Sequence, residues 1–159
     1  MTDMLVRLYD LPPVEPLLER LAAAGITCRR PEAFERSAVL AFVAREFPGW
    51  VDEVTVALSR SPATCFVAAR EGRPVGFAAY HATRPDFFGP TGVEEGERGR
   101  GIGAALLLLA LHAMAAEGYA YAIIGSVGPA AFYERTVGAV PIPGSDPGIF
   151  RSRLQSPAP

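Results

Sequence analysis

The stretch Glu97-Arg98-Gly99-Arg100-Gly101-Ile102-Gly103-Ala104 decides the fold, because it joins a β-rich run to a long apolar helix. Its three glycines within five residues leave the backbone free to turn, so several N–H groups can point at one ligand. The dipole of the following helix adds positive potential, and the two arginines add charge that complements phosphate. The stretch predicts a cradle for a pyrophosphate or a similar anion, with a plain strand-to-helix turn as the alternative.

Two common phosphate motifs do not fit this stretch. A P-loop requires Gly-Lys-Ser/Thr, and the chain contains no lysine. A Rossmann site requires G-x-G-x-x-G at the first turn of a βαβ unit. Here the spacing is G-x-G-x-G, and the preceding residues 65–70 and 75–80 predict an antiparallel hairpin around Glu71-Gly72-Arg73-Pro74.

Around this stretch, strands and helices alternate in a way that favours a single α/β domain over residues 1–159. Residues 1–25 are expected to form an extra strand and helix, and residues 156–159 a loose tail. Strands are predicted at residues 4–9, 26–29, 65–70, 75–80, 87–93, 119–125 and 149–153. Helices are predicted at residues 14–24, 32–47, 51–60, 101–117 and 130–137.

The composition restricts the function. The net charge of −2 argues against a general nucleic-acid-binding surface, which needs a dominant basic face. Cys28 and Cys65 lie far apart with only two histidines in the chain, so we expect neither a metal site nor a disulfide framework. The uncharged stretch 101–116 is shorter than the roughly 20 residues of a membrane span. We therefore expect a cytoplasmic protein with no membrane partner.

A second informative segment is Phe132-Tyr133-Glu134-Arg135. Tyr133 lies thirty positions after Gly103, which leaves room for one helix and one strand to bring the chain back beside the glycine-rich stretch. A phenol is a weak acid with a pKa near 10, so it can give a proton to a leaving thiolate. The alternative is a tyrosine packed at a helix edge.

Taken together, the pattern Arg98-x-x-Gly101-x-Gly103 and the later Phe132-Tyr133-Glu134 resemble the GNAT superfamily of acetyl-CoA-dependent N-acyltransferases over about residues 26–140. The resemblance implies a mixed, mostly antiparallel twisted sheet with helices on both faces, whose strands beside the loop splay apart to admit the acyl-pantetheine arm. It also implies direct transfer of an acetyl group from acetyl-CoA to a primary amine of a small molecule or peptide.

The resemblance assigns roles to individual residues. The family's loop holds the coenzyme A pyrophosphate through its backbone amides, and it falls here on Arg98, Gly99, Arg100, Gly101, Ile102, Gly103 and Ala104. The end of the preceding strand binds pantetheine and the acetyl carbonyl, which suggests Val93, Glu94 and Glu95. Tyr133 matches the family's acid. Ser126 stands where the family often has asparagine and is expected among the cofactor contacts; Pro129 replaces an alanine.

The general base is less defined by the sequence. Asp86 and Glu94 flank the strand 87–93 and are the candidates, with solvated loop carboxylates and an ordered water as the alternatives. His81 is a further candidate for the acceptor side. Trp50, Phe87 and Phe88 are candidates for an aromatic wall of the acceptor pocket, with ordinary packing as the alternative.

Two other functions are also compatible with these residues. A non-catalytic acyl-CoA-binding sensor or regulatory module would keep the loop and use Tyr133 only for packing. A phosphate-ligand protein unrelated to coenzyme A would bind nucleotides equally well. An uncovered edge of the last strand also offers a surface for a homodimer.

Overall fold

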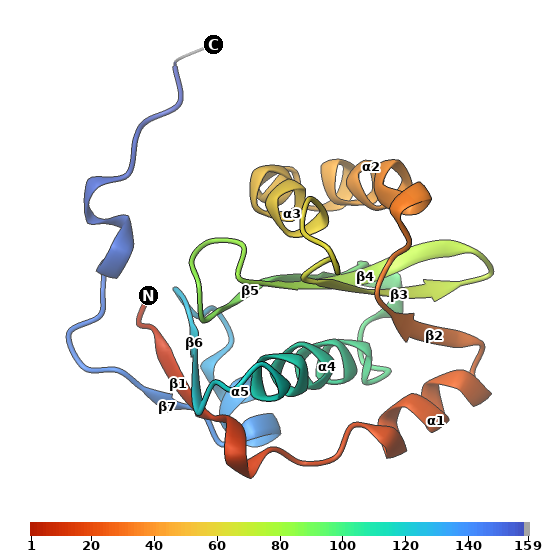
Figure 1. The fold of residues 1–159 in the computed structure, drawn as a ribbon, viewed down its shortest axis with the longest axis horizontal. Coiled ribbons are helices and arrows are strands. Elements are labelled where there is room, and N and C mark those ends of the chain that lie inside the picture. Colours follow the sequence, from red (N-terminus) through yellow and green to blue (C-terminus); the bar gives the residue numbers. More distant parts are fainter. Residues whose placement is uncertain (158–159) are drawn as a thin grey trace.

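The computed structural model describes residues 1–157 (Figure 1). Within them lie seven strands and five α-helices. The strands are β1 (Met4–Arg7), β2 (Ile26–Arg29), β3 (Cys65–Arg70), β4 (Arg73–Tyr80), β5 (Phe87–Val93), β6 (Tyr121–Ile124) and β7 (Val140–Pro141). The helices are α1 (Glu15–Ala23), α2 (Arg36–Glu46), α3 (Val51–Leu58), α4 (Ile102–Ala116) and α5 (Ala130–Val137).

The strands form one sheet in the order β2-β3-β4-β5-β6-β1-β7. Every neighbouring pair is antiparallel except β5 and β6, which are parallel. Helices α2 and α3 cover one face of the sheet, and α1, α4 and α5 lie on the other (Figure 1). The predicted mixed, mostly antiparallel sheet with helices on both faces is confirmed.

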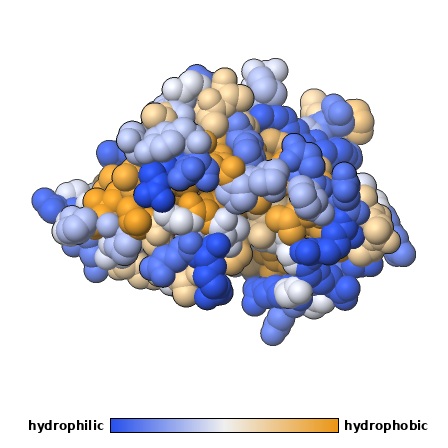
Figure 2. All heavy atoms as spheres, turned by 90° about the horizontal axis from the view of Figure 1, so that it is seen from below, coloured by the Kyte–Doolittle hydropathy of each residue, from blue (hydrophilic) through white to orange (hydrophobic). Residues whose placement is uncertain are grey.

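The sheet separates two apolar cores. Successive side chains of a strand point to opposite faces, and in β4 Phe77 packs with α2 and α3 while Ala78 packs with α4. Helix α4 is apolar around its whole circumference because α1 and α5 flank it, through residues such as Leu17 and Phe132. Seen from this side, the surface carries separate apolar patches between hydrophilic residues (Figure 2).

The parallel pair β5–β6 opens like a fork. The two strands pair only at Phe87 with Ile123 and at Phe88 with Ile124. Strand β5 continues to Val93, whereas β6 ends at Ile124. Among the described residues, the second half of β5 therefore has no strand neighbour on the β6 side, which confirms the predicted splaying.

The N-terminal strand is an inner strand of the sheet. It pairs with β6 on one side and with β7 on the other, and Met4 and Val6 are buried in the core. The sequence predicted this strand and the helix after it as an extra unit, without their place in the sheet. Because β1 completes the sheet next to β6, the first residues of the chain lie close to the fork.

The predicted strand at residues 149–153 is wrong. Residues Gly148–Ser152 form a 3-10 helix, and β7 (Val140–Pro141) lies instead where no strand was predicted. Gly148 has φ +58, a left-handed conformation that does not continue a strand, and the segment lacks alternating apolar residues. Of the predicted tail, residues 156–157 have no regular structure, and residues 158–159 lie outside the described residues.

Candidate active site

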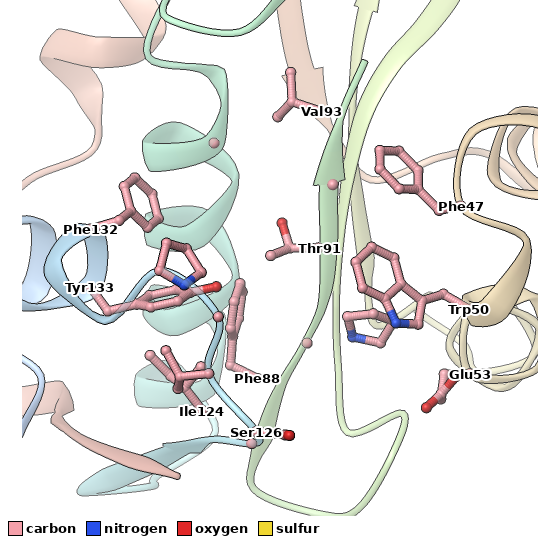
Figure 3. Close-up of a pocket in the computed structure, with 18 of the residues that line it drawn as sticks. Phe47, Trp50, Glu53, Phe88, Thr91, Val93, Ile124, Ser126, Phe132 and Tyr133 are labelled. Carbon is pink, nitrogen blue, oxygen red and sulfur yellow. The ribbon is translucent and has the colours of Figure 1, made fainter. Parts of the chain in front are cut away.

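A cleft of about 930 Å³ opens where β5 and β6 part. One wall consists of the start of α4 and of α5, and the other of the α2–α3 connection and the start of α3, with β5 between them (Figure 3). Eight residues that the sequence assigned to cofactor binding line it: Val93, Arg98, Gly99, Gly101, Ile102, Gly103, Ala104 and Ser126.

The glycine-rich stretch forms one end of the cleft. Gly99 and Gly101 have φ +80 and +90, and Gly101 is the N-cap of α4. The first turn of a helix has N–H groups without partners in the helix, and here Ile102, Gly103 and Ala104 of that turn line the cleft. A Cβ on Gly103 would lie 3.8 Å from both Phe132 and Val93, so the walls are close here. This geometry suits an anion.

The arginines of the stretch differ in their partners. Arg98 lines the cleft, and its Nε donates a hydrogen bond to the Val93 carbonyl at 3.0 Å. Arg100 Nε instead lies 3.1 Å from a carboxylate oxygen of Glu97, which also pairs with Arg70, and Arg100 does not line the cleft. Of the two predicted phosphate-binding guanidinium groups, the structure places only that of Arg98 in the cleft.

Arg20 of α1 is a cation that the sequence analysis missed. Its guanidinium lies against Gly101, where an added Cβ would be 2.8 Å from Arg20 Nη2. The local sequence of α1 carries no signal for this contact, since it depends on how α1 packs beside α4.

The main chain of β5 presents polar groups to the cleft. The N–H of Glu94 donates to the Val75 carbonyl at 2.9 Å, so Glu94 faces β4 with its backbone. Main-chain groups alternate in direction along an antiparallel strand, which turns those of Thr91 and Val93 away from β4. The bond from Arg98 to the Val93 carbonyl agrees with this direction. These groups can pair with an extended ligand between the strands.

Tyr133 lies inside the cleft on α5 and is 6 % exposed. Its ring contacts Phe132 and Phe88, with centroids at 5.0 and 6.4 Å, and its hydroxyl points into the cleft (Figure 3). Burial raises the pKa of Tyr133 to about 12. The phenol therefore stays protonated at neutral pH and can act as a proton donor, not as a base.

Ser126 reaches the cleft through a bend after β6. Its φ of +48 is a left-handed conformation, and its N–H donates to Asp3 Oδ1 at 2.8 Å. Asp3, immediately before β1, is buried and was missed by the sequence analysis. Asp3 can reach Ser126 only because β1 is an inner strand of the sheet, next to β6.

The carboxylates proposed as bases lie elsewhere. Neither Asp86 nor Glu94 lines the cleft; Glu94 forms an ion pair with Arg73 at 2.9 Å. Burial raises the pKa of Asp86, and the nearby His81 lowers it to a smaller extent. Glu95 also lies outside the lining.

His81, considered for the acceptor side, does not line the cleft. It is buried, its Nε2 lies 2.7 Å from Glu117 Oε2, and its Nδ1 accepts the Asp86 N–H at 2.9 Å. These contacts hold the loop between β4 and β5 in place, so His81 has a structural role near the start of β5.

The wall opposite Tyr133 is aromatic. On this wall Trp50 lines the cleft, as the sequence suggested, together with Phe47 and Glu53. Phe87 and Phe88 of β5, also suggested by the sequence, line the cleft too, but Phe88 lies beside Tyr133. The end of the Phe47 ring lies against β5, where an added Cβ at Gly92 would be 2.6 Å from it. The sequence read Phe47 only as the end of a helix.

Residues 1–157 contain neither a metal-binding cluster nor a helix that could span a membrane. No group of three or more histidine, cysteine, aspartate or glutamate side chains is placed to hold a metal ion there. In the same residues, no helix has the length and apolar character needed to cross a membrane.

Comparison with known proteins identifies the family of this chain. The sequence profile of the Acetyltransferase (GNAT) family matches residues 29–139. No curated protein matches the sequence. Among solved structures, the glucosamine N-acetyltransferase region of a fungal multi-domain GH3 beta-N-acetylglucosaminidase superposes with a TM-score of 0.73 at 20% identity, covering 89% of this chain and 19% of that one.

Two bacterial GCN5-related N-acetyltransferases are also similar. The one from Sphaerobacter thermophilus has a TM-score of 0.67 at 22% identity, covering 89% of this chain and 48% of that one. The one from Kribbella flavida has a TM-score of 0.52 at 19% identity, covering 88% and 53%.

At these identities the solved structures establish the fold alone. The chain spans about a fifth of the fungal enzyme and about half of the Sphaerobacter protein. The family profile covers well over half of the chain, from the end of β2 to the residue before β7, and includes both the glycine-rich stretch and Tyr133. This chain therefore belongs to the Acetyltransferase (GNAT) family.

Proposed function

We propose that this protein transfers an acetyl group from acetyl-CoA to a primary amine of a small molecule or peptide. The observation that carries the proposal is that the glycine-rich stretch, the free half of β5 and Tyr133 line one and the same cleft. Membership of the acetyltransferase family supports an acyl transfer. Acetyl-CoA as the donor and an amine as the acceptor are part of the proposal.

In this proposal the cleft is divided between the two substrates. The first turn of α4 and Arg98 hold the pyrophosphate, and the main chain of Thr91 and Val93 pairs with the pantetheine arm. Arg98 Nε now donates to the Val93 carbonyl, so a pantetheine amide that binds this carbonyl releases the Arg98 side chain toward the phosphates. The acceptor enters from the side of Trp50 and Phe47.

The chemical step is a direct displacement. The neutral amine nitrogen attacks the thioester carbonyl carbon, a C–N bond forms, and the oxygen becomes an oxyanion that a main-chain N–H of β5 stabilises. The C=O bond then re-forms as the C–S bond breaks, and the thiolate takes a proton from the Tyr133 hydroxyl, which regains a proton from solvent. Because Asp86 and Glu94 lie outside the cleft lining, we assign the proton lost by the amine to water.

The absence of both carboxylates from the cleft lining also favours the second candidate function, a non-catalytic acyl-CoA-binding module. Thiol release from acetyl-CoA separates the two. The purified protein is incubated with acetyl-CoA and a panel of primary amines, and the acetylated amine is identified by mass spectrometry. We expect thiol release that depends on the amine. Tight coenzyme binding without thiol release for every amine would support the binding module.

A further inference from the structure

Glu53 is a half-buried carboxylate on the acceptor side of the cleft. Among residues 1–157 it takes part in no ion pair. The other acid of the lining, Glu97, is already neutralised by Arg70 and Arg100. A carboxylate that loses part of its hydration without a partner is unfavourable, so Glu53 is suited to a cationic ligand.

The position of Glu53 separates it from the reaction centre. Phe47, Trp50 and Glu53 follow one another at every third residue, and the ring of Phe47 stacks on that of Trp50 with centroids 5.4 Å apart. Phe47 lies on Gly92, next to the β5 groups that face the thioester in our proposal. Six residues of helical chain span roughly 10 Å. In Figure 3 Glu53 lies beyond Trp50, on the side away from Phe47 and Val93.

We propose that the acceptor carries a second positive charge, which Glu53 binds roughly 10 Å from the attacking amine. The apolar chain between the two charges lies along the rings of Phe47 and Trp50, whose faces attract cations as well as methylene groups. This inference rests on the proposed function and narrows its acceptor to diamines, polyamines and similar dications.

The charges around the cleft fit this orientation. Arg98 lines the cleft from the glycine-rich stretch, where it complements phosphate in our proposal, and Glu53 lines it from the α3 wall. One further cation, Arg153, lines the cleft from the exposed segment after the last 3-10 helix. If Arg153 rather than Glu53 selected the acceptor, a ligand with a carboxylate at its far end would be preferred.

Three acceptors of equal chain length test the proposal: hexanediamine, hexylamine and aminohexanoate. The readout is kcat/KM for thiol release from acetyl-CoA, expressed as the ratio of diamine to monoamine. We expect the wild type to prefer hexanediamine and Glu53→Gln to lower the ratio about tenfold, which corresponds to losing one partly buried charge pair. Asp52→Asn is the matched control, since Asp52 is the exposed neighbour outside the cleft and should keep the wild-type ratio.

Several results would overturn the proposal. They are a ratio that stays the same in Glu53→Gln, an equal loss for both amines, or a preference for aminohexanoate that disappears in Arg153→Gln. An equal loss would mean that Glu53 acts on the attacking amine itself.

Calorimetric titration of the protein–coenzyme A complex with the same three compounds makes the test independent of turnover. We expect hexanediamine to bind more tightly than hexylamine, and only Glu53→Gln to remove the difference. If no amine releases thiol but this selectivity is present, the proposed function fails while the dication site stands. If coenzyme A binds and acetyl transfer occurs without a preference for the diamine, the proposed function stands while the dication site fails.

Discussion

The carboxylate of Asp3 accepts a hydrogen bond from the main-chain N–H of Ser126 at 2.8 Å. Asp3 is only 8 % exposed, and Ser126 lines the cleft in a left-handed conformation. The first residues of the chain, which lie outside the family match, thus hold the bend that follows β6. The shape of the cleft depends on a strand that the sequence predicts only as an extra unit.

Replacing Asp3 should loosen this bend. Asp3→Ala leaves the half-buried Ser126 N–H without its acceptor, and an unsatisfied buried donor costs up to about 1–3 kcal/mol. We expect lower stability in urea unfolding and a higher KM for acetyl-CoA. Asp10→Ala, at an exposed acid near the same terminus, is the control and should change neither. Equal KM values for the Asp3 variant and the wild type would show that Asp3 does not shape the cleft.

Tyr133→Phe removes the proposed acid while keeping the ring in place. General acid catalysis contributes about 10²–10⁴ in rate, so we expect kcat to fall within that range while the affinity for coenzyme A stays nearly the same. Tyr121→Phe, at a half-exposed tyrosine outside the cleft, serves as control. Unchanged turnover in Tyr133→Phe would remove this residue from the mechanism.

The raised pKa of Tyr133 also predicts a pH dependence of stability. Its folded-state pKa of about 12 exceeds the ordinary value of 10, so the folded state disfavours ionisation. The contribution is fully present below about pH 10 and is lost as the pH rises toward 12. Urea unfolding across this range should show a steeper loss of stability in the wild type than in Tyr133→Phe. Parallel curves would contradict the assignment.

Gly92→Ala tests the contact between the aromatic wall and β5. The new Cβ would lie 2.6 Å from the Phe47 ring, which must move, and such overpacking costs about 1–3 kcal/mol. We expect a lower melting temperature than in the wild type. We also expect the KM for the amine to rise more than the KM for acetyl-CoA. Gly96→Ala is a matched control, because nothing lies within 4 Å of its added Cβ. Similar melting temperatures for the two variants would contradict the close packing.

Arg98 and Arg100 form a natural pair for testing the anion site. Arg98 lines the cleft, whereas Arg100 is held by Glu97. Arg98→Gln should weaken coenzyme A binding about tenfold and reduce its dependence on salt, since one charge-assisted contact is lost. Arg100→Gln should have a much smaller effect. A larger loss of affinity for the Arg100 variant would mean that Arg100, and not Arg98, binds the phosphates.

Local sequence patterns predicted most of the fold. Strands β2, β3 and β5 and helix α5 have the predicted bounds, because turn residues such as Gly72 and apolar periodicity mark their ends. The glycine-rich stretch likewise predicted the cleft end that Gly99, Gly101 and Gly103 line.

The remainder depends on packing between distant segments. Asp3 meets Ser126 and Arg20 meets Gly101 only because β1 and α1 return to the fork between β5 and β6. No local pattern carries such pairings. The predicted strand at 149–153 is wrong for a local reason: Gly148 has a left-handed conformation that does not continue a strand, and the segment lacks alternating apolar residues.

The central claim is that the cleft binds coenzyme A through the turn at Gly101. It is tested most directly by thermal unfolding of the purified protein with acetyl-CoA, coenzyme A and ATP at equal concentration. A ligand that binds only the folded state raises the melting temperature. We predict stabilisation by both coenzyme A species and none by ATP. Equal stabilisation by ATP would indicate a general phosphate site, and no shift with any ligand would mean that the glycine-rich stretch is only a turn.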